Sequence, residues 1–252
     1  GTFATVIVVR DVFNFTQSSE YATGVRLWFI LGTALVASML ISGLVSVLVE
    51  VVAYRRLRRR NAGVLAPLIS AIGVSMVIAE SVRIATDSRP VASPRAMDKS
   101  FIGQFFDAGI RLDNTIIVIA ALILFVALIT YINKTRMGKA IRAVSMNPNA
   151  ARLMGVNIDA VISATFLIGG VMTGAAGFFY VLKYENTASS IGFELGIAAF
   201  TAAILGGIGN IKGAFFGGLA LGLLETYASF FLGTQWKAVT VFVVLVLVLY
   251  TR

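Results

Sequence analysis

The chain contains no cysteine and no histidine, and charged residues make up only 13% of it. Without cysteine, disulfides and cysteine-ligated metal or iron–sulfur sites are excluded. Without histidine, the chain lacks the commonest general base and the commonest metal ligand. These absences argue against a hydrolytic or metal-dependent active site. We therefore predict no catalytic residue, no metal site and no cofactor held by this chain.

The shortage of charge goes with an excess of apolar residues. Hydrophobic residues make up 58% of the 252 residues, whereas a soluble domain carries about 25% charged residues. A helix needs about 20 apolar residues to cross the hydrocarbon core of a membrane. We therefore predict an all-α polytopic membrane protein with a single transmembrane domain over residues 1–252.

Apolar runs alternate with polar segments along the chain. Full spans are predicted at residues 27–53, 62–86, 114–133 and 158–182, and shorter apolar segments at residues 195–208, 214–231 and 238–250. Residues 1–9 are interpreted as the tail of a span whose beginning is missing. The polar segments 10–26, 87–113 and 183–194 are predicted on the outer side, with residues 101–106 at the membrane surface.

The positive charge is concentrated in two segments. The formal net charge is +9, and residues 54–60 and 134–152 each hold five basic residues and no acidic one. The rest of the chain is nearly neutral, because these ten leave 11 of the 21 basic residues against 12 acidic ones. Basic residues beside membrane spans mark the cytoplasmic side. We therefore place the loops 54–60 and 134–157 in the cytoplasm and expect no binding to nucleic acid.

Glycines interrupt the apolar sequence between residues 206 and 213. Gly206, Gly207 and Gly209 predict either a tight inner turn between two short spans or a break within a partly inserted hairpin. Backbone freed at membrane depth must be shielded by protein or face a water-filled cavity. These three glycines are therefore candidates for the lining of a solute path.

Small residues also recur at helical spacing, where they let helix backbones approach closely in lipid. This pattern favours ordinary helix packing, and the alternative is helices that slide during transport. The pairs are Gly170 with Gly174, Gly213 with Gly217, and Gly218 with Gly222.

Three acidic residues lie within or beside apolar runs. Glu80 and Arg83 are three residues apart and share a helical face, so we predict a buried pair, either structural or lining a solute path. Glu225 has the same two interpretations. Glu50 lies one turn before the arginines of residues 54–60, which favours a local salt bridge. Pairing is expected because an unpaired charge inside a membrane is costly.

The basic segment 134–157 contains the signals of a short helix. Asn147 can accept hydrogen bonds from free backbone N–H groups, and Pro148 tolerates the first helical position. Gly155 marks the end, because glycine adopts the left-handed cap at little cost. A helix of about two turns is marginal alone, so we predict that a partner protein packs on it. Gly138 is not part of a phosphate loop, so any ATP must bind to another chain.

Several segments resemble one family of membrane proteins, and together they cover nearly the whole chain. Residues 147–157, NPNAARLMGVN, are similar to the cytoplasmic loop of ABC-importer permeases for branched-chain amino acids. Further segments that resemble this family are VAYR at 52–55, ATF at 164–166, AAG at 175–177, AFTAAILGGIGN at 199–210 and GAFFGG at 213–218.

The resemblance implies a permease domain of about eight membrane segments, the first of them missing here, in the bacterial inner membrane. It implies as partners a second homologous permease subunit, two cytoplasmic ATPase subunits that bind ATP and Mg, and an extracytoplasmic solute-binding protein.

In this family a coupling helix with the consensus Glu-Ala-Ala, three residues, then Gly docks in a groove of the ATPase. Here Asn149 replaces the Glu, and Arg142 and Arg152 are expected to supply the charged contacts. The corresponding residues are Arg142, Asn147, Pro148, Asn149, Ala150, Ala151, Arg152 and Gly155.

The resemblance thus predicts a permease subunit of an ATP-driven importer that moves branched-chain amino acids into the cytoplasm. The motifs do not fix the solute, so a permease for urea or a short amide is an alternative. Another alternative is an ion-coupled secondary transporter in which Glu80 and Glu225 bind protons or ions. A structural scaffold is disfavoured by the glycine break at residues 206–213.

Overall fold

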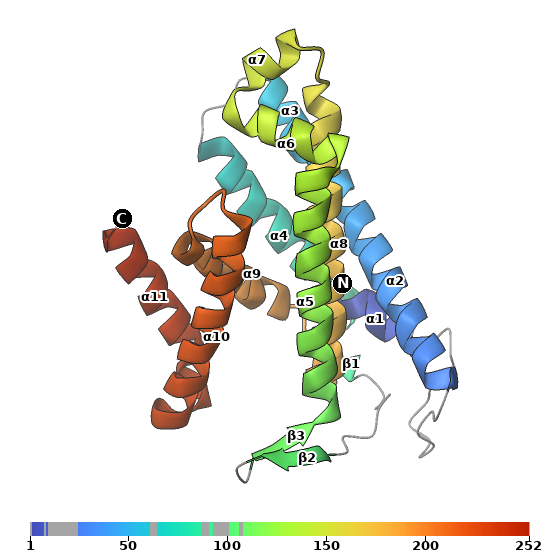
Figure 1. Cartoon of the computed structure of the whole chain (residues 1–252), viewed down its shortest axis with the longest axis vertical. Coiled ribbons are helices and arrows are strands. Elements are labelled where there is room, and N and C mark those ends of the chain that lie inside the picture. The colour runs from blue at the N-terminus through green and yellow to red at the C-terminus, as the bar shows by residue number, and fades with distance from the viewer. Residues whose placement is uncertain are drawn as a thin grey trace. The chain divides into compact units, whose positions relative to one another are not determined.

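The computed structural model of the chain describes residues 2–7, 9, 25–60, 65–86, 91–92, 101–105 and 108–251. The chain forms two compact units, Gly1–Ala188 and Ser189–Arg252. The first unit contains α1 (Thr2–Ile7), α2 (Val25–Val49), the π-helix η2 (Glu50–Tyr54), α3 (Arg55–Arg59), α4 (Leu65–Ala85), β1 (Val91–Ala92), β2 (Phe101–Phe105), β3 (Ala108–Arg111), α5 (Leu112–Lys134), α6 (Arg136–Met146), α7 (Pro148–Leu153), α8 (Ile158–Tyr184) and β4 (Asn186–Thr187) (Figure 1). The second contains α9 (Ile191–Gly206), α10 (Ile211–Leu232), the 3-10 helix η3 (Thr234–Trp236) and α11 (Lys237–Thr251).

Four described helices are long and apolar enough to cross a membrane. They match the apolar runs predicted at residues 27–53, 114–133, 158–182 and 214–231, and α4 confirms a helix in the run at 62–86. Most of the predicted outer segment 10–26 lies outside the described residues. The four helices are Phe29–Arg58, Leu112–Lys134, Ile158–Tyr184 and Ile211–Leu232.

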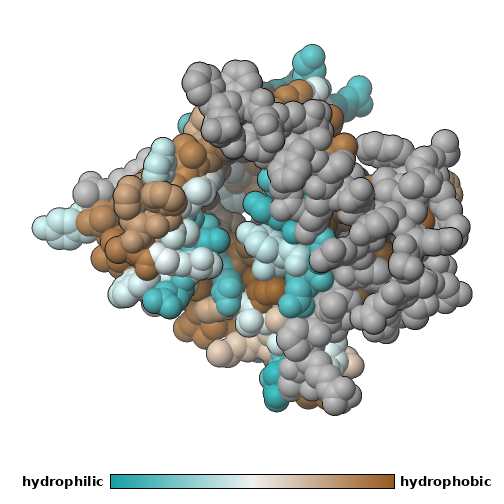
Figure 2. Space-filling view, turned by 90° about the horizontal axis from the view of Figure 1, so that it is seen from below, coloured by the Kyte–Doolittle hydropathy of each residue, from teal (hydrophilic) through white to brown (hydrophobic). Residues whose placement is uncertain are grey.

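These helices expose large apolar side chains. Leu44 and Leu48 of α2 and Ile123 of α5 each keep more than half of their surface exposed. In the view from below, hydrophobic residues lie open at the surface beside hydrophilic ones (Figure 2). Such faces suit contact with lipid or with other membrane helices. The prediction of a helical polytopic membrane protein is confirmed.

The core of the first unit is the antiparallel pair of α2 and α8 (Figure 1). A Cβ atom on Gly170 would lie 2.5 Å from Cβ of Ser46, and one on Gly174 would lie 2.5 Å from the carbonyl oxygen of Ser38. The Ser38 hydroxyl donates to the Gly174 carbonyl at 2.7 Å, and the Ser46 hydroxyl donates to the Phe166 carbonyl at 2.7 Å. The predicted close packing at Gly170 and Gly174 is confirmed, and serine hydroxyls reinforce it.

The second unit is built around a tight hairpin of α9 and α10. A Cβ atom on Gly213 would lie 1.9 Å from the carbonyl oxygen of Gly206, so the two helices meet at backbone distance. Gly207 and Gly209 have positive φ angles of 95° and 92°, which glycine adopts without strain. The glycine break is therefore a tight turn between two helices. Helix α10 is long enough to span a membrane, longer than the short span predicted, whereas α9 is shorter. Whether the two form separate spans or a partly inserted hairpin stays a prediction.

The other predicted glycine pairs have different surroundings. A Cβ atom on Gly217 would lie 2.4 Å from the carbonyl oxygen of Ala202, so the predicted packing of Gly213 and Gly217 is confirmed. Among the described residues, a Cβ atom on Gly222 has no neighbour within 4 Å, and one on Gly218 meets only Ala202 Cβ at 3.9 Å. The third pair therefore makes no close helix contact in this part of the chain.

Two short antiparallel strand pairs lie at one end of the first unit (Figure 1). In the pair of β1 and β4, Val91 lies opposite Thr187, which joins the two segments predicted on the outer side, 87–113 and 183–194. Strands β2 and β3 form a hairpin where a surface segment was predicted. None of these strands was predicted. Helices α3, α6 and α7, which carry the basic segments, lie at the opposite end (Figure 1).

The turn between α5 and α6 depends on one glycine. Gly138 is buried, and a Cβ atom there would fall 2.2 Å from the carbonyl oxygen of Ile132. The Thr135 hydroxyl caps α6 by accepting from the Gly138 amide at 3.0 Å. Helix α6 was not predicted, and this turn places it directly before α7.

Candidate functional site

Helix α7 begins as its sequence predicts. Asn147 has extended backbone geometry, and its side-chain oxygen accepts hydrogen bonds from the amides of Asn149 at 3.0 Å and Ala150 at 3.1 Å. Pro148 occupies the first turn, where its missing N–H leaves no partner unsatisfied. These local contacts fix the start of a helix that is too short to be stable by propensity alone.

The end of α7 is a glycine cap of the Schellman type. The Val156 amide donates to the Ala151 carbonyl and the Gly155 amide donates to the Arg152 carbonyl, both at 3.0 Å. Gly155 has a φ of 78°, in the left-handed region that favours glycine. The predicted start at Asn147 and end at Gly155 are both confirmed.

The exposed surface of α7 is a mixture of apolar and basic groups. Ala151 is buried, whereas Ala150 and Asn149 are exposed. Met146, Leu153 and Met154 each keep more than 80% of their surface exposed. We call these three residues the apolar docking residues. Exposed apolar side chains of this size, outside the spans, are typical of a surface that binds another protein.

The two arginines predicted to contact a partner are also exposed. Arg142 lies in α6 and donates to the Asn133 side-chain oxygen at 3.1 Å. Arg152 lies in the last turn of α7, where a positive charge is favourable beside the free carbonyl groups of the helix. The structure therefore brings the predicted coupling residues together in the α6–α7 segment.

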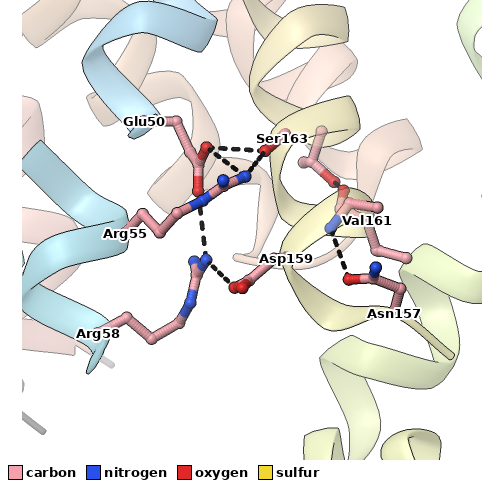
Figure 3. A network of polar contacts seen from close by, with 9 residues as sticks. Glu50, Arg55, Arg58, Asn157, Asp159, Val161 and Ser163 are labelled. Carbon is pink, nitrogen blue, oxygen red and sulfur yellow. Dashed lines mark hydrogen bonds and ion pairs between the residues drawn. The ribbon is translucent and has the colours of Figure 1, made fainter. Parts of the chain in front are cut away.

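Directly after α7, a network of charged residues joins the end of α2 to the start of α8 (Figure 3). Arg58 donates to Glu50 at 3.2 Å and to Asp159 at 2.5 Å. The Ser163 hydroxyl donates to Glu50 at 2.7 Å and accepts from Arg55 at 3.0 Å. Arg55 is also 3.6 Å from the Glu50 carboxylate. We call these five residues the Glu50 network.

Glu50 is the centre of this network. Its side chain has no exposed surface, and a buried carboxylate is tolerated only where charges and hydrogen bonds surround it. It is also the first residue of the π-helix η2, a distortion that is frequent at functional sites. The predicted local salt bridge with the arginines is confirmed.

The α8 residues of the Glu50 network, Asp159 and Ser163, were not predicted. Asn157 caps α8 by accepting from the Ala160 amide at 3.1 Å, and Asp159 follows in the first turn. An acidic residue in a first turn is explained by the helix dipole alone. The sequence therefore held no signal that Asp159 and Ser163 also meet the arginines at the end of α2.

The candidates for a solute path lie in both units. Arg83 donates through Nε to the Glu80 carboxylate at 2.8 Å and also through Nη2. The predicted pair therefore forms. Both side chains are about half exposed in the isolated chain, so their burial in a membrane or an assembly stays a prediction.

The remaining path candidates belong to the second unit. Gly206, Gly207 and Gly209 form the turn between α9 and α10, and Glu225 lies in the far half of α10. Glu225 is therefore separated from this turn by several turns of helix. A solute path that includes these residues together with Glu80 and Arg83 stays a prediction.

Comparison with known proteins identifies the family. The family model "Branched-chain amino acid transport system / permease component" matches residues 4–249. The permease LivH of a high-affinity branched-chain amino acid transport system in Escherichia coli (strain K12) is 38% identical over 225 residues, covering 88% of this chain and 72% of LivH. The corresponding permease BraD of Pseudomonas aeruginosa is 37% identical over 223 residues, covering 87% of this chain and 72% of BraD.

More distant similarity extends to a sugar permease. The fructose import permease FrcC of Rhizobium meliloti is 26% identical over 170 residues, covering 64% of this chain and 47% of FrcC. No solved structure matches the chain. The chain is therefore a membrane permease rather than an enzyme, and it belongs to the family of permease components of branched-chain amino acid transport systems.

Proposed function

We propose that this chain is the permease subunit of an ATP-driven importer that moves branched-chain amino acids into the cytoplasm. The observation that carries the proposal is the capped helix α7 with its exposed apolar docking residues, in a chain of the permease family. LivH and BraD, which are described as branched-chain amino acid permeases, match 88% and 87% of this chain. The fructose permease matches only 64% at lower identity, which favours an amino acid over a sugar.

In this proposal, α7 docks into a groove of a cytoplasmic ATPase subunit. Met146, Leu153 and Met154 provide apolar contacts, and their exposure in the isolated chain is then explained by burial in the complex. The small, exposed Ala150 permits a close approach, and Arg142 and Arg152 provide charged contacts in place of the family's glutamate.

The transport cycle follows from this docking. ATP and Mg bind to the two ATPase subunits, whose closure moves α7. The attached spans then shift the pathway from inward-open to outward-open, and the external solute-binding protein releases its solute into the opening. Hydrolysis resets the pathway. A second homologous permease subunit forms the other half of the pathway in the bacterial inner membrane.

The docking surface is tested by changing Leu153. The Leu153→Asp variant places a charge in the centre of the proposed contact without disturbing the core, because Leu153 is 88% exposed. We expect the ATPase subunits to dissociate from the purified permease, and Leu153→Met to retain them. ATPase subunits that remain bound to Leu153→Asp would contradict docking through α7.

The solute is tested in vesicles that contain the whole transporter. We expect uptake of labelled leucine to require both ATP and the solute-binding protein, and to be inhibited by unlabelled isoleucine and valine. Inhibition by urea but not by isoleucine would favour the short-amide alternative. Leucine uptake that follows a proton gradient without ATP would overturn the proposal in favour of an ion-coupled transporter.

The transmission of movement is tested at the cap of α7. A Cβ atom on Gly155 meets nothing within 4 Å, so a substitution there strains only the backbone. We expect Gly155→Val to shift the orientation of α7 and reduce uptake for each ATP hydrolysed. Gly155→Asn is the matched control, because asparagine tolerates the left-handed conformation. Equal uptake by the two variants would contradict a role for this cap.

A further inference from the structure

The docking of an ATPase does not account for the Glu50 network. Glu50 is completely buried at the end of a helix long and apolar enough to span a membrane. A hydrophobic residue at such a position commonly stabilises a protein as well as a buried ion pair does. The network therefore needs an explanation beyond stability, and its position directly behind α7 suggests one.

Two separate contacts tie α8 to the end of α2. The first is the ion pair of Asp159 with Arg58, and the second is the hydrogen bonds of Ser163 with Glu50 and Arg55. Both α8 residues lie in its first two turns, and both sets of partners lie in η2 and α3 (Figure 3). The start of α8 cannot move far from the end of α2 without breaking these contacts.

The rest of the interface is equally tight. The close backbone contacts at Gly170 and Gly174, with the hydroxyl bonds of Ser38 and Ser46, continue along α2 and α8. Packed interfaces of this kind switch between discrete arrangements rather than deforming continuously. Helices α2 and α8 therefore behave as one rigid body from the Glu50 network to Ser38.

The α8 residues of the network follow α7 closely along the chain. The cap at Gly155 leads through Asn157 into the first turn of α8, which contains Asp159. A displacement of α7 reaches α8 through this short connection. The packing around Gly170 and Gly174 begins two turns or more farther along α8, so the network is the contact that passes this displacement to the end of α2 nearest to α7.

We propose that the Glu50 network is the joint through which movement of α7 is transmitted to α2 as well as to α8. Asp159 and Ser163 are positioning residues in this role, since they act through α2 and α3 rather than on nucleotide or solute. The inference rests on the proposed function, because it requires α7 to be the segment that the ATPase moves.

The test is the double variant Asp159→Ala with Ser163→Ala in the reconstituted transporter. It removes both contacts of α8 with η2 and α3. Glu50 keeps Arg55 and Arg58 as partners, so no buried charge loses all its partners. We expect the complex to assemble and to hydrolyse ATP, while the solute moved per ATP falls at least about fivefold, the lower end of coupling between protein sites. The control Asp159→Glu with Ser163→Thr keeps both functional groups and should keep the ratio.

The ratio of transport to hydrolysis separates coupling from folding. A variant of which only a fraction folds loses uptake and hydrolysis in proportion, so its ratio stays the same. An unchanged ratio of uptake to hydrolysis in the transporter that still works would overturn the joint. The Leu153→Asp variant tests the proposed function separately through loss of the ATPase subunits. If Leu153→Asp releases them but the double variant keeps a normal ratio, docking stands and the joint is wrong.

A second measurement uses the unaltered network. The chain has no cysteine, so spin labels can be attached at Leu48→Cys in α2 and Leu167→Cys in α8, two exposed positions. We expect the same label separation by electron paramagnetic resonance with and without ATP, because the two helices move together. A separation that changes with the nucleotide state would overturn the joint even if the double variant cannot be purified.

Discussion

Two groups of acidic and basic residues lie in apolar helices of this protein, and they differ in almost every physical respect. Glu80 and Arg83 pair within one turn of α4, and both side chains are about half exposed. Glu50 has no exposed surface and is bonded by residues of both its own segment and α8. Spacing along a helix therefore determines which charges pair, whereas a neighbouring helix determines which pair is buried within the chain.

The serines of the two helices show the same contrast. On α4, the hydroxyls of Ser75 and Ser81 return to carbonyls of their own helix, at 2.8 and 2.7 Å. On α2, the hydroxyls of Ser38 and Ser46 instead donate to carbonyls of α8. Serine hydroxyls thus bond within their own helix on α4 but bond to a neighbouring helix on α2, where the backbone of α8 lies close.

The largest effect is expected from Glu50→Ala. Removal of the carboxylate leaves Arg55 and Arg58 close together without their shared counter-ion, and leaves the Ser163 hydroxyl short of an acceptor. We expect the free energy of unfolding to fall by about 3 kcal/mol, as for other broken buried pairs. Thermal unfolding in detergent, followed by circular dichroism, measures this change. A decrease in the free energy of unfolding smaller than that caused by Ser46→Ala would contradict the central role of Glu50.

A smaller effect is expected from Gly170→Ala, which tests the close packing of α8 against α2. The new Cβ would lie 2.5 Å from Cβ of Ser46, and overpacking of this kind costs about 2 kcal/mol. Gly169→Ala is the matched control, because a Cβ atom there meets nothing within 4 Å. We expect the control to unfold at the same or a slightly higher temperature, since alanine favours helix. Equal melting of the two variants would refute the close packing.

A still smaller effect is expected from Ser46→Ala. It removes one hydrogen bond between α2 and α8, worth about 1 kcal/mol. Ser81→Ala removes a bond within α4 only, and alanine is a better helix former than serine. We expect Ser81→Ala to leave the unfolding temperature unchanged, and a destabilisation equal to that of Ser46→Ala would show that the two helices are not different in kind.

The sequence predicted the features that depend on neighbouring residues. Asn147, Pro148 and Gly155 determine the start and end of α7 through contacts no more than a few residues apart. The pairing of Glu80 with Arg83 is equally local. The spans were predicted because lipid demands long apolar runs. The two basic segments were predicted on one side of the membrane, and the helices that carry them, α3, α6 and α7, lie at one end of the first unit.

The features that were missed depend on distant residues or on weak local signals. Asp159 and Ser163 lie 101 and 113 residues along the chain from their partners Arg58 and Glu50, and no periodicity connects them. The burial of Glu50 and the exposure of Glu80 follow from where α8 packs, which the spacing of charges does not contain. Helix α6 had a local signal in the cap at Thr135, but it was hidden within a basic segment assigned as loop.

The smallest effect is expected from Glu80→Gln, because this pair lies on a single helix. The ionic partner of Glu80 among the described residues is Arg83 on the same helix. The amide oxygen of glutamine can still accept from Arg83, so no contact between helices is lost. We expect no change in the unfolding temperature of the isolated chain beyond experimental error. A decrease like that of Glu50→Ala would mean that another part of the protein covers α4. In the assembled transporter, the same variant separates the two interpretations of this pair: a raised KM for solute at unchanged stability would assign it to the solute path, whereas unchanged uptake would leave it a structural pair.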